Sequence, residues 1–406
     1  MRDAGDVVTP STVTRGVPAW MHIAQVMPRS FLATWRATLV RAAHVPRLQP
    51  WPTAWPLVCL DDLVVTVMTM RSIGHPAAAQ FDQTMRDTEE AVRRLSLAQA
   101  GADLEALHPL PPAPDGVRRT KQARLATGFE HISCASRYQP PVEIPGQDRW
   151  FADGANAVAH AYVLRHDDAP RPWLLALHPY GAGEPRDMLM MGSLDLHRGL
   201  GVNVIHPVAP LHGPRARRKR TVHLFGPDPV MTFLGMSQTI WDLRRWVAWV
   251  RSQGATSVST YGISFGGYCA ALLAGLETGL DCAVAAAPVV DIGGVIGSNI
   301  GRLLGPDAEL SARLTEKAPI ALNRVISPLS FRPKVPPSGR YIFAAVGDRF
   351  TPPDQAVQLW HHWEEPEIRW HQGSHVSGLL APGWRRLVAH ALRRSGAVEH
   401  RQGAGV

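Results

Sequence analysis

The chain has 406 residues, a formal net charge of +8, 45% hydrophobic residues and 19% charged residues. These proportions exclude a wholly disordered chain, a collagen-like chain and a polytopic membrane protein, and the length exceeds the roughly 250 to 300 residues that one core usually serves. Only four of the 42 cationic residues are Lys. Because no zinc-finger, RNP-like or basic-zipper pattern accompanies the Arg excess, we expect no nucleic-acid partner.

The four cysteines are widely scattered and form no CxxC pair, so a metal site is not expected and a reducing compartment fits. The N-terminal stretch contains acidic residues and prolines but no apolar segment, so we expect no signal peptide. The most apolar early stretch, residues 55–70, contains Asp61 and Asp62 and is too short and too charged to span a bilayer. The sequence therefore predicts a cytoplasmic protein.

Residues 17–116 predict a helical N-terminal extension and a linker, after a disordered tail at 1–16. Phe31, Trp35 and Leu39 recur at helical spacing, and residues 108–116 are rich in proline. Large apolar side chains cost about 1.5 to 3 kcal/mol each when left in water, so we expect the extension to pack on the rest of the chain. Contact with a membrane surface or a partner is the alternative.

From about residue 125 onward, short apolar runs alternate with helical stretches. The expected strands are 157–165, 173–181, 202–210, 257–267, 282–291, 340–348 and 367–375. The expected helices are 186–199, 231–254, 265–278, 353–364 and 376–395. This alternation predicts an α/β domain over residues 117–395, with a mostly parallel sheet covered by helices on both faces, followed by a disordered tail at 396–406. Ligands of such sheets bind beyond the carboxyl ends of the strands.

Residues 262–266 read Gly-Ile-Ser-Phe-Gly, a G-x-S-x-G pattern between an apolar run and a helix of small residues. A serine on such a sharp turn projects its hydroxyl above the sheet, and Gly262 and Gly266 leave room where side chains would collide. The following helix points its positive end at Ser264. We therefore predict that Ser264 is a nucleophile; the alternative is a glycine-rich turn with an inert serine.

A serine nucleophile needs a base and an acid, and both candidates follow later strands. His375 lies in a glycine-rich loop after the last strand and is the expected base; His371 is its rival. Asp348 follows the strand 340–348 and is the expected acid, which orients the imidazole; Asp291 is the alternative. The chain order is then serine, aspartate, histidine.

These motifs resemble the α/β-hydrolase superfamily over roughly residues 150–395. The doubled glycine after Phe265 looks most like the prolyl-oligopeptidase-like and dienelactone-hydrolase-like branches. The segments HPYGAGEPRD and APLHGPRARRK also resemble uncharacterised hydrolase-domain proteins with a helical N-terminal extension. The resemblance implies an acid loop with a proline four residues after the aspartate, which Asp348 and Pro352 match, and Asp291 stands at a position where relatives carry an alternative acid.

The resemblance also implies an oxyanion hole with two N–H donors. One is the backbone N–H of Phe265. Relatives carry His-Gly in the other loop, where this chain has His178 and Pro179. Because proline has no N–H, Tyr180 is the expected second donor, with Gly181 next to it. We expect His178 to be a structural loop residue rather than a second base.

Two regions keep alternatives open. The basic run Arg215–Arg220 is either a solvated loop or a contact for an acidic or phosphate-bearing substrate. Residues 292–338 stand where relatives insert a cap, and they form either a lid over the acyl pocket or helices packed beside the sheet.

The sequence thus predicts a serine hydrolase, and more narrowly a carboxylic-ester hydrolase for a small-molecule ester or acyl substrate. It would work through Ser264, His375 and Asp348 and an acyl-enzyme, with no cofactor and no catalytic metal. Peptidase or acyltransferase activity on the same fold is one alternative. A catalytically idle scaffold that binds a membrane or partner is another. The acyl chain, the leaving group and the oligomeric state do not follow from the sequence.

Overall fold

The structure is a computed structural model of the chain. It describes residues 23–40, 42–49, 52–73, 78–99, 101, 103–124, 127–152, 154–166, 168, 170–216, 224–304 and 309–398. The expected tail at 1–16, most of the expected tail at 396–406 and the basic residues 217–220 lie outside these ranges.

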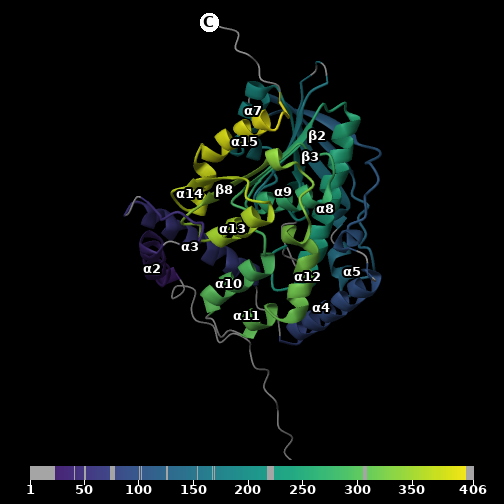
Figure 1. The fold of residues 1–406 in the computed structure, drawn as a ribbon. Helices are drawn as coiled ribbons and strands as arrows, with labels where there is room; N and C mark the ends of the chain where they lie inside the picture. Colours follow the sequence, from purple (N-terminus) through teal and green to yellow (C-terminus); the bar gives the residue numbers. More distant parts are fainter. Residues whose placement is uncertain are drawn as a thin grey trace, which may run out of the picture.

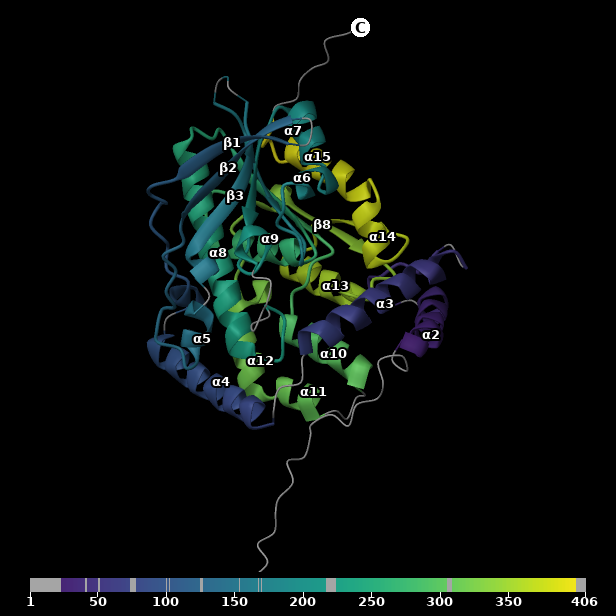
Figure 2. The ribbon, with the colours of Figure 1, turned by 180° about the vertical axis from the view of Figure 1, so that it is seen from behind.

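The described residues build one nine-stranded mixed sheet in the order β1-β2-β3-β5-β4-β6-β7-β8-β9 (Figures 1 and 2). The strands are β1 (Arg118–Arg124), β2 (Thr127–Ala135), β3 (Val158–Leu164), β4 (Trp173–Leu177), β5 (Asn203–Val208), β6 (Val258–Ile263), β7 (Cys282–Ala286), β8 (Arg340–Ala345) and β9 (Glu367–His371). Every pair from β5 to β9 is parallel, and the pairs from β1 to β3 and between β3 and β5 are antiparallel. The predicted α/β class with a mostly parallel sheet is confirmed.

Helices cover both faces of the sheet, as predicted. The α-helices that follow β2 in the described chain are α5 (Gln147–Phe151), α6 (Asp187–Met190), α7 (Ser193–Leu200), α8 (Pro229–Ser252), α9 (Phe265–Leu276), α10 (Ile292–Leu304), α11 (Glu309–Leu314), α12 (Lys317–Ile326), α13 (Pro353–His362), α14 (His375–Leu380) and α15 (Gly383–Arg394). Side chains of α8, α9 and α13 share one core with one face of the sheet, and those of α6, α7 and α15 share a second core with the other face.

Strand β4 shows why the sheet needs cover on both sides. All five of its residues are buried. Because successive side chains of a strand point to opposite faces, Trp173, Leu175 and Leu177 enter the core beneath α8 and α9, whereas Leu174 and Ala176 enter the core beneath α7 and α15. An apolar run without alternation is therefore the signature of a doubly covered strand.

Two expected helices are each divided in the structure. The stretch 186–199 forms α6 and α7, which are separated at Gly192 with a φ of 62°. The stretch 376–395 forms α14 and α15, because Pro382 interrupts it and has no N–H for a continuous helix. The hairpin of β1 and β2 was not predicted, because β1 reads Arg-Arg-Thr-Lys-Gln-Ala-Arg and carries no apolar alternation. It joins the sheet as an edge strand through its register with β2.

The N-terminal helices α2 (Val26–Leu39), α3 (Ala54–Ile73) and α4 (Ala78–Gln99) lie against the α/β region. Helix α3 contacts α10 and α14, and α4 contacts α8 and α12; Figure 2 shows α3 beside α10 and α14 at the end of the sheet where the parallel strands finish. Phe81 and Met85 of α4 are buried against Ile300 and Leu314.

Helix α2 departs from the expectation that the aromatic side chains of the extension are covered. Phe31 and Trp35 are 41% and 46% exposed. The face that α2 turns toward the protein carries Ser30 and Thr34, and the Ser30 hydroxyl donates to the Asp62 carboxylate over 2.7 Å. Trp20 and Trp51 lie outside the described residues. Among the described helices, none combines the length and the apolar character needed to cross a membrane.

Candidate active site

The turn between β6 and α9 presents Ser264 in a conformation that non-glycine residues rarely adopt, with φ 58° and ψ −114°. Its N–H donates to the carbonyl of Ala286 on β7 over 2.8 Å, which anchors the turn. A Cβ on Gly262 would overlap the carbonyl of Gly266, and a Cβ on Gly266 would overlap the carbonyl of Leu177 on β4. The two glycines of the G-x-S-x-G pattern are therefore required by backbone contact.

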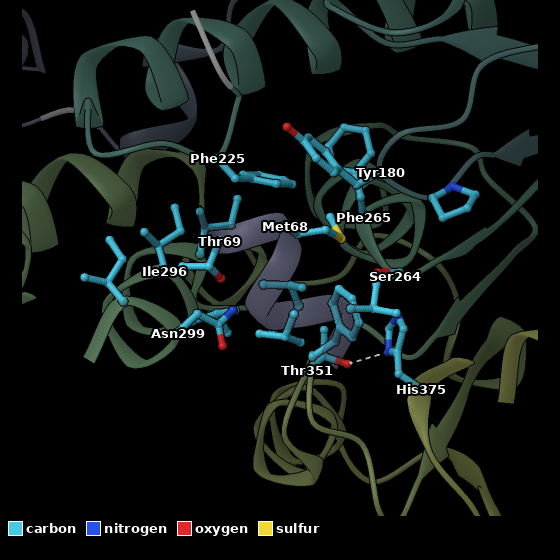
Figure 3. A pocket seen from close by; sticks show the side chains of 18 of the residues that line it. Met68, Thr69, Tyr180, Phe225, Ser264, Phe265, Ile296, Asn299, Thr351 and His375 are labelled. Atoms are coloured by element: carbon cyan, nitrogen blue, oxygen red, sulfur yellow. Dashed lines mark hydrogen bonds between the residues drawn. The ribbon is translucent and has the colours of Figure 1, made fainter. Parts of the chain in front are cut away.

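Ser264 and His375 lie beside one another on the wall of a cavity of ≈ 290 Å³ (Figure 3). No hydrogen bond joins the two side chains in this structure. Catalytic hydrogen bonds are often long without substrate and tighten when substrate binds. The arrangement places a hydroxyl and an imidazole at the same point of one cavity.

Asp348 holds the ring of His375. Its Oδ2 lies 2.6 Å from Nδ1 of His375, and the two side chains are almost completely buried. The other oxygen, Oδ1, accepts from the N–H groups of Phe350 and Thr351, and the Thr351 hydroxyl donates to Oδ2 over 2.9 Å. With Nδ1 engaged by Asp348, Nε2 is the remaining ring nitrogen of His375.

The two rivals make other contacts. The ring of His371 is 3.0 Å from the Ser377 hydroxyl. Asp291 accepts from the N–H of Gly294 over 2.9 Å at the start of α10. The structure therefore brings Asp348, and not Asp291, to His375.

Two of the expected oxyanion donors, Phe265 and Tyr180, border the same cavity, whereas Gly181 is not among the residues that line it. Phe265 is the first residue of α9, so its N–H has no partner within the helix. Pro179, Tyr180, Ser264 and Phe265 all line the cavity. Gly181 has a φ of 82°, the left-handed conformation that lets the loop turn directly after Tyr180.

His178 is buried, and both of its ring nitrogens are used. Nδ1 lies 2.9 Å from the carbonyl of Pro179, and Nε2 accepts from the N–H of Ala209 over 3.1 Å. Burial lowers the pKa of His178. These contacts match a structural loop residue.

Arg215, the first residue of the basic run, matches neither a solvated loop nor a contact for an acidic or phosphate-bearing substrate. It is fully buried and pairs with Asp242 over 2.9 Å, and it donates to the carbonyls of Val208 and Asn156. Arg215 is thus part of the core under β5 rather than a solvated or substrate-binding cation. The other basic residues of the run lie outside the described part of the chain.

The walls of the cavity are mainly apolar and come from both halves of the chain. Helix α3 contributes Val64, Val65 and Met68, and α10 contributes Ile292, Val295, Ile296 and Ile300, with Phe225 and Leu379 from elsewhere. In the region 292–338, α10 therefore shapes the cavity, whereas α12 packs against α8 and α4.

Comparison with known proteins places the chain. No protein-family model matches it. Two Mycobacterium tuberculosis proteins, "Uncharacterized protein MT2702" (strain CDC 1551 / Oshkosh) and "Uncharacterized protein Rv2627c" (strain ATCC 25618 / H37Rv), are each 38% identical over 295 residues, which cover 72% of this chain and 70% of theirs. Our chain belongs to the same family as these two proteins.

A solved structure fixes the fold. Acetyl xylan esterase 1 from Thermoanaerobacterium sp. JW/SL YS485 superposes with a TM-score of 0.51 at 14% identity, over 77% of this chain and 94% of that chain. The chain therefore has the α/β-hydrolase fold. The resemblance predicted from the elbow motif is confirmed at the level of the fold.

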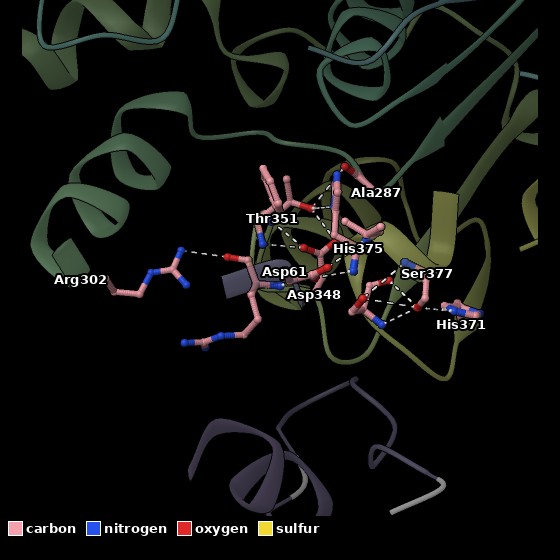
Figure 4. Close-up of polar contacts among 12 residues, drawn as sticks. Asp61, Ala287, Arg302, Asp348, Thr351, His371, His375 and Ser377 are labelled. Carbon is pink, nitrogen blue, oxygen red and sulfur yellow. Dashed lines mark hydrogen bonds and ion pairs between the residues drawn. The ribbon is translucent and has the colours of Figure 1, made fainter. Parts of the chain in front are cut away.

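One residue at this α/β-hydrolase site was missed from the sequence. Asp61 of α3 is fully buried, and its carboxylate accepts from the backbone N–H groups of His375 and Val376 over 2.6 and 3.0 Å (Figure 4). The sequence carries one indication of this role, because a carboxylate inside an otherwise apolar helix needs hydrogen-bond partners if the helix is buried. In the sequence, Asp61 otherwise argues only against a membrane span.

Charges around His375 tune its basicity. Burial lowers the pKa of His375, but the charge and hydrogen bond of Asp348 and the charge of Asp61 outweigh burial and raise it above the usual 6.5. The ring of Phe350 stacks on the imidazole with centroids 4.9 Å apart. The charges around the site therefore favour the protonated form of the His375 imidazole.

Within the part of the chain that the structure describes, no group of three or more His, Cys, Asp or Glu side chains could hold a metal ion.

Proposed function

We propose that the protein is a serine carboxylic-ester hydrolase. The observation that carries the proposal is the placement of Ser264 on a strained elbow beside His375, whose Nδ1 lies 2.6 Å from Asp348. A serine hydroxyl becomes a strong nucleophile only beside a base, and the base needs a third group to orient it. The structural neighbour with this fold is an acetyl xylan esterase, and an esterase agrees with the proposed ester chemistry.

In the proposed reaction, Nε2 of His375 takes the proton as Ser264 Oγ attacks the ester carbonyl carbon. The negative charge that develops on the carbonyl oxygen would be met by the N–H groups of Phe265 and of Tyr180 or Gly181. His375 then returns the proton to the leaving alcohol, and an acyl-enzyme remains. Water, deprotonated by His375, releases the carboxylic acid and restores Ser264.

The cavity supports an apolar acyl group. Its walls carry Val, Ile, Met, Leu and Phe side chains, and the polar side chains Thr69 and Asn299 stand apart from Ser264 in Figure 3. Apolar surface in such a pocket favours a hydrocarbon chain over a charged or heavily hydroxylated group. We therefore infer a small-molecule ester with an aliphatic or aromatic acyl part.

Hydrolysis of p-nitrophenyl butyrate tests the proposal. Ser264→Ala, His375→Ala and Asp348→Asn should each lower kcat by at least about 1,000-fold, because members of such a set act as a unit. The rivals serve as matched controls: His371→Ala and Asp291→Asn should keep kcat within about threefold. Equal losses in the Asp291 and Asp348 variants would contradict the assignment. Faster turnover of peptide anilides, or of acyl transfer to added alcohols, would favour the peptidase or acyltransferase alternative.

Helix α2 supports a second role, contact with a phospholipid surface. Its large apolar side chains face outward and its small polar ones inward, the reverse of a helix that packs on a core. Met27, Leu32 and Leu39 are 57%, 65% and 56% exposed. The helix contains no acidic residue and carries Arg29 and Arg36, which suits an anionic lipid surface.

Co-sedimentation with vesicles of phosphatidylcholine and phosphatidylglycerol (3:1) tests this role. Phe31→Ser combined with Trp35→Ser should reduce vesicle binding at least tenfold without changing turnover of a soluble ester. Leu97→Ser on α4, where the leucine is 64% exposed, is the matched control and should bind like the parent chain. Failure of the parent chain to sediment with vesicles would refute the membrane contact.

A further inference from the structure

Asp61 stands far from the candidate triad in the sequence and next to it in space. It lies 314 residues before His375, on the helix α3 of the N-terminal extension. Its Oδ2 accepts from the N–H of His375 and its Oδ1 from the N–H of Val376. One carboxylate thus binds two successive N–H groups at the start of α14.

These bonds fix the backbone that carries the imidazole. The ring of His375 is held by Asp348, whereas its main-chain N–H is held by Asp61 (Figure 4). Two other contacts support this turn: Ser374 caps α14 in a reciprocal pair with Ser377, and the N–H of Gly347 donates to the carbonyl of Gly373 over 2.8 Å. Asp61 is the partner of the main-chain N–H of His375 itself, and it comes from the N-terminal extension.

The neighbouring carboxylate has a different task. Asp62 accepts from Ser30 on α2 and from the side chains of Arg302 and Arg349. It ties α2 and α10 to the acid loop and does not contact His375. Two adjacent buried aspartates on one helix therefore have different partners. Asp62 makes the ion pairs, whereas Asp61 accepts from the backbone N–H groups of His375 and Val376 and, over 3.3 Å, from that of Arg349.

We propose that Asp61 is a positioning residue of the active site, which holds His375 where its Nε2 can take the proton of Ser264. This inference rests on the proposed hydrolase function. It makes the N-terminal helix α3 a functional part of the catalytic unit rather than an appendage, since the same helix also supplies Val64, Val65 and Met68 to the cavity wall. Asp61 lies about one helical turn before Val64 and Val65 and about two turns before Met68.

The charge of Asp61 has its own consequence. The charged groups that face it are Asp348 and His375 on the site side, with Arg349 and Arg302 beyond, bound to Asp62. Burial and the charge of Asp348 raise the pKa of Asp61, whereas the charge of His375 and the two backbone hydrogen bonds lower it. The net result is a pKa of about 6. Above that pH, the carboxylate favours the protonated imidazole. Removing it should lower the pKa of His375.

The test compares Asp61→Asn with Asp62→Asn in the full chain, with p-nitrophenyl butyrate as substrate. We expect Asp61→Asn to lower kcat 10- to 100-fold with KM changed less than threefold, and to move the acidic limb of the kcat profile to lower pH. The sign follows because a base works only when neutral, and a lower His375 pKa keeps it neutral to lower pH. Asp62→Asn should lose thermal stability and keep kcat within about threefold.

Two outcomes would overturn the proposal: a kcat and pH limb in Asp61→Asn equal to those of the parent chain, or equal losses of kcat in both variants. If Asp61→Asn does not fold, Asp61→Glu replaces it; it keeps the charge but displaces the carboxylate by one methylene. We expect it to lower kcat at least fivefold with the pH limb in place, and an unchanged kcat would overturn the proposal.

A readout without turnover separates this proposal from the proposed function. The pKa of His375 can be followed by NMR in the Ser264→Ala chain, where no hydrolysis is needed. Asp61→Asn in that background should lower it, and no change would contradict the positioning role even in an active enzyme. Absence of hydrolysis in the parent chain, with the NMR shift present, would instead refute the hydrolase function alone.

Discussion

The backbone at Ser264 shows how single residues make the site. A φ of 58° at a serine is costly and persists only where the surroundings enforce it. Here the enforcing contacts are the Ser264 N–H bond to Ala286 on one side and the packing of Gly266 on the Leu177 carbonyl on the other. The strain holds the hydroxyl at the mouth of the cavity before any substrate arrives.

Gly266→Ala tests that packing. The new Cβ would overlap the backbone of β4, which cannot move without disturbing the sheet. We expect a loss of about 1 to 3 kcal/mol in the free energy of unfolding, together with a loss of ester hydrolysis larger than the stability change explains. Gly199→Ala on α7, where a Cβ meets nothing within 4 Å, is the control and should leave both unchanged. Equal behaviour of the two variants in urea unfolding would contradict the elbow geometry.

The same scale shows why some site residues were predictable and one was not. Gly262 and Gly266, two residues before and after Ser264, mark it as the serine of a G-x-S-x-G turn. Asp348 follows the apolar strand β8 and His375 follows the last strand, β9, and the carboxyl ends of parallel strands meet at one edge of the sheet. Asp61 has no such local mark. Its role depends on where α3 packs against α14, and that follows from tertiary contacts across 314 residues.

Among the elements, α3 links the N-terminal extension to the cavity. The extension was expected to pack on the rest of the chain, without a defined geometry, and α3 forms one wall of the cavity with α10. Its apolar residues face two environments: Val64 and Met68 turn to the cavity, whereas Leu57, Leu60 and Leu63 are 37%, 41% and 37% exposed. A helix that is apolar on several faces gives no periodic signal for which face is functional.

Met68→Trp should therefore change substrate choice. The larger side chain would fill part of the ≈ 290 Å³ cavity, so kcat/KM for p-nitrophenyl octanoate should fall at least tenfold while that for the acetate changes less than threefold. Leu60→Trp on the exposed face of the same helix is the matched control and should leave both values unchanged. A parallel fall for octanoate and acetate would contradict the assignment of this cavity to the acyl group.

At the scale of the whole molecule, the proposed catalytic unit draws on both ends of the chain. The sheet and the core helices were predictable, because buried strands such as β4 and β7 are continuous apolar runs. The β1–β2 edge was not, because its polar sequence carries no burial pattern. The sequence predicted only that the apolar side chains of the extension would pack on the rest of the chain. The positions of its helices α2, α3 and α4 also depend on buried polar pairs such as Ser30 with Asp62, which no sequence pattern indicates.

The central claim is that Ser264 is the nucleophile of a working hydrolase, and covalent labelling with a fluorophosphonate followed by peptide mass spectrometry tests it most directly. The parent chain should take up one phosphonate group, located on the peptide that contains Ser264, and the folded Ser264→Ala chain should take up none. Full labelling of the Ser264→Ala chain, or a folded parent chain that is not labelled at all, would contradict the account and leave the idle scaffold as the better explanation.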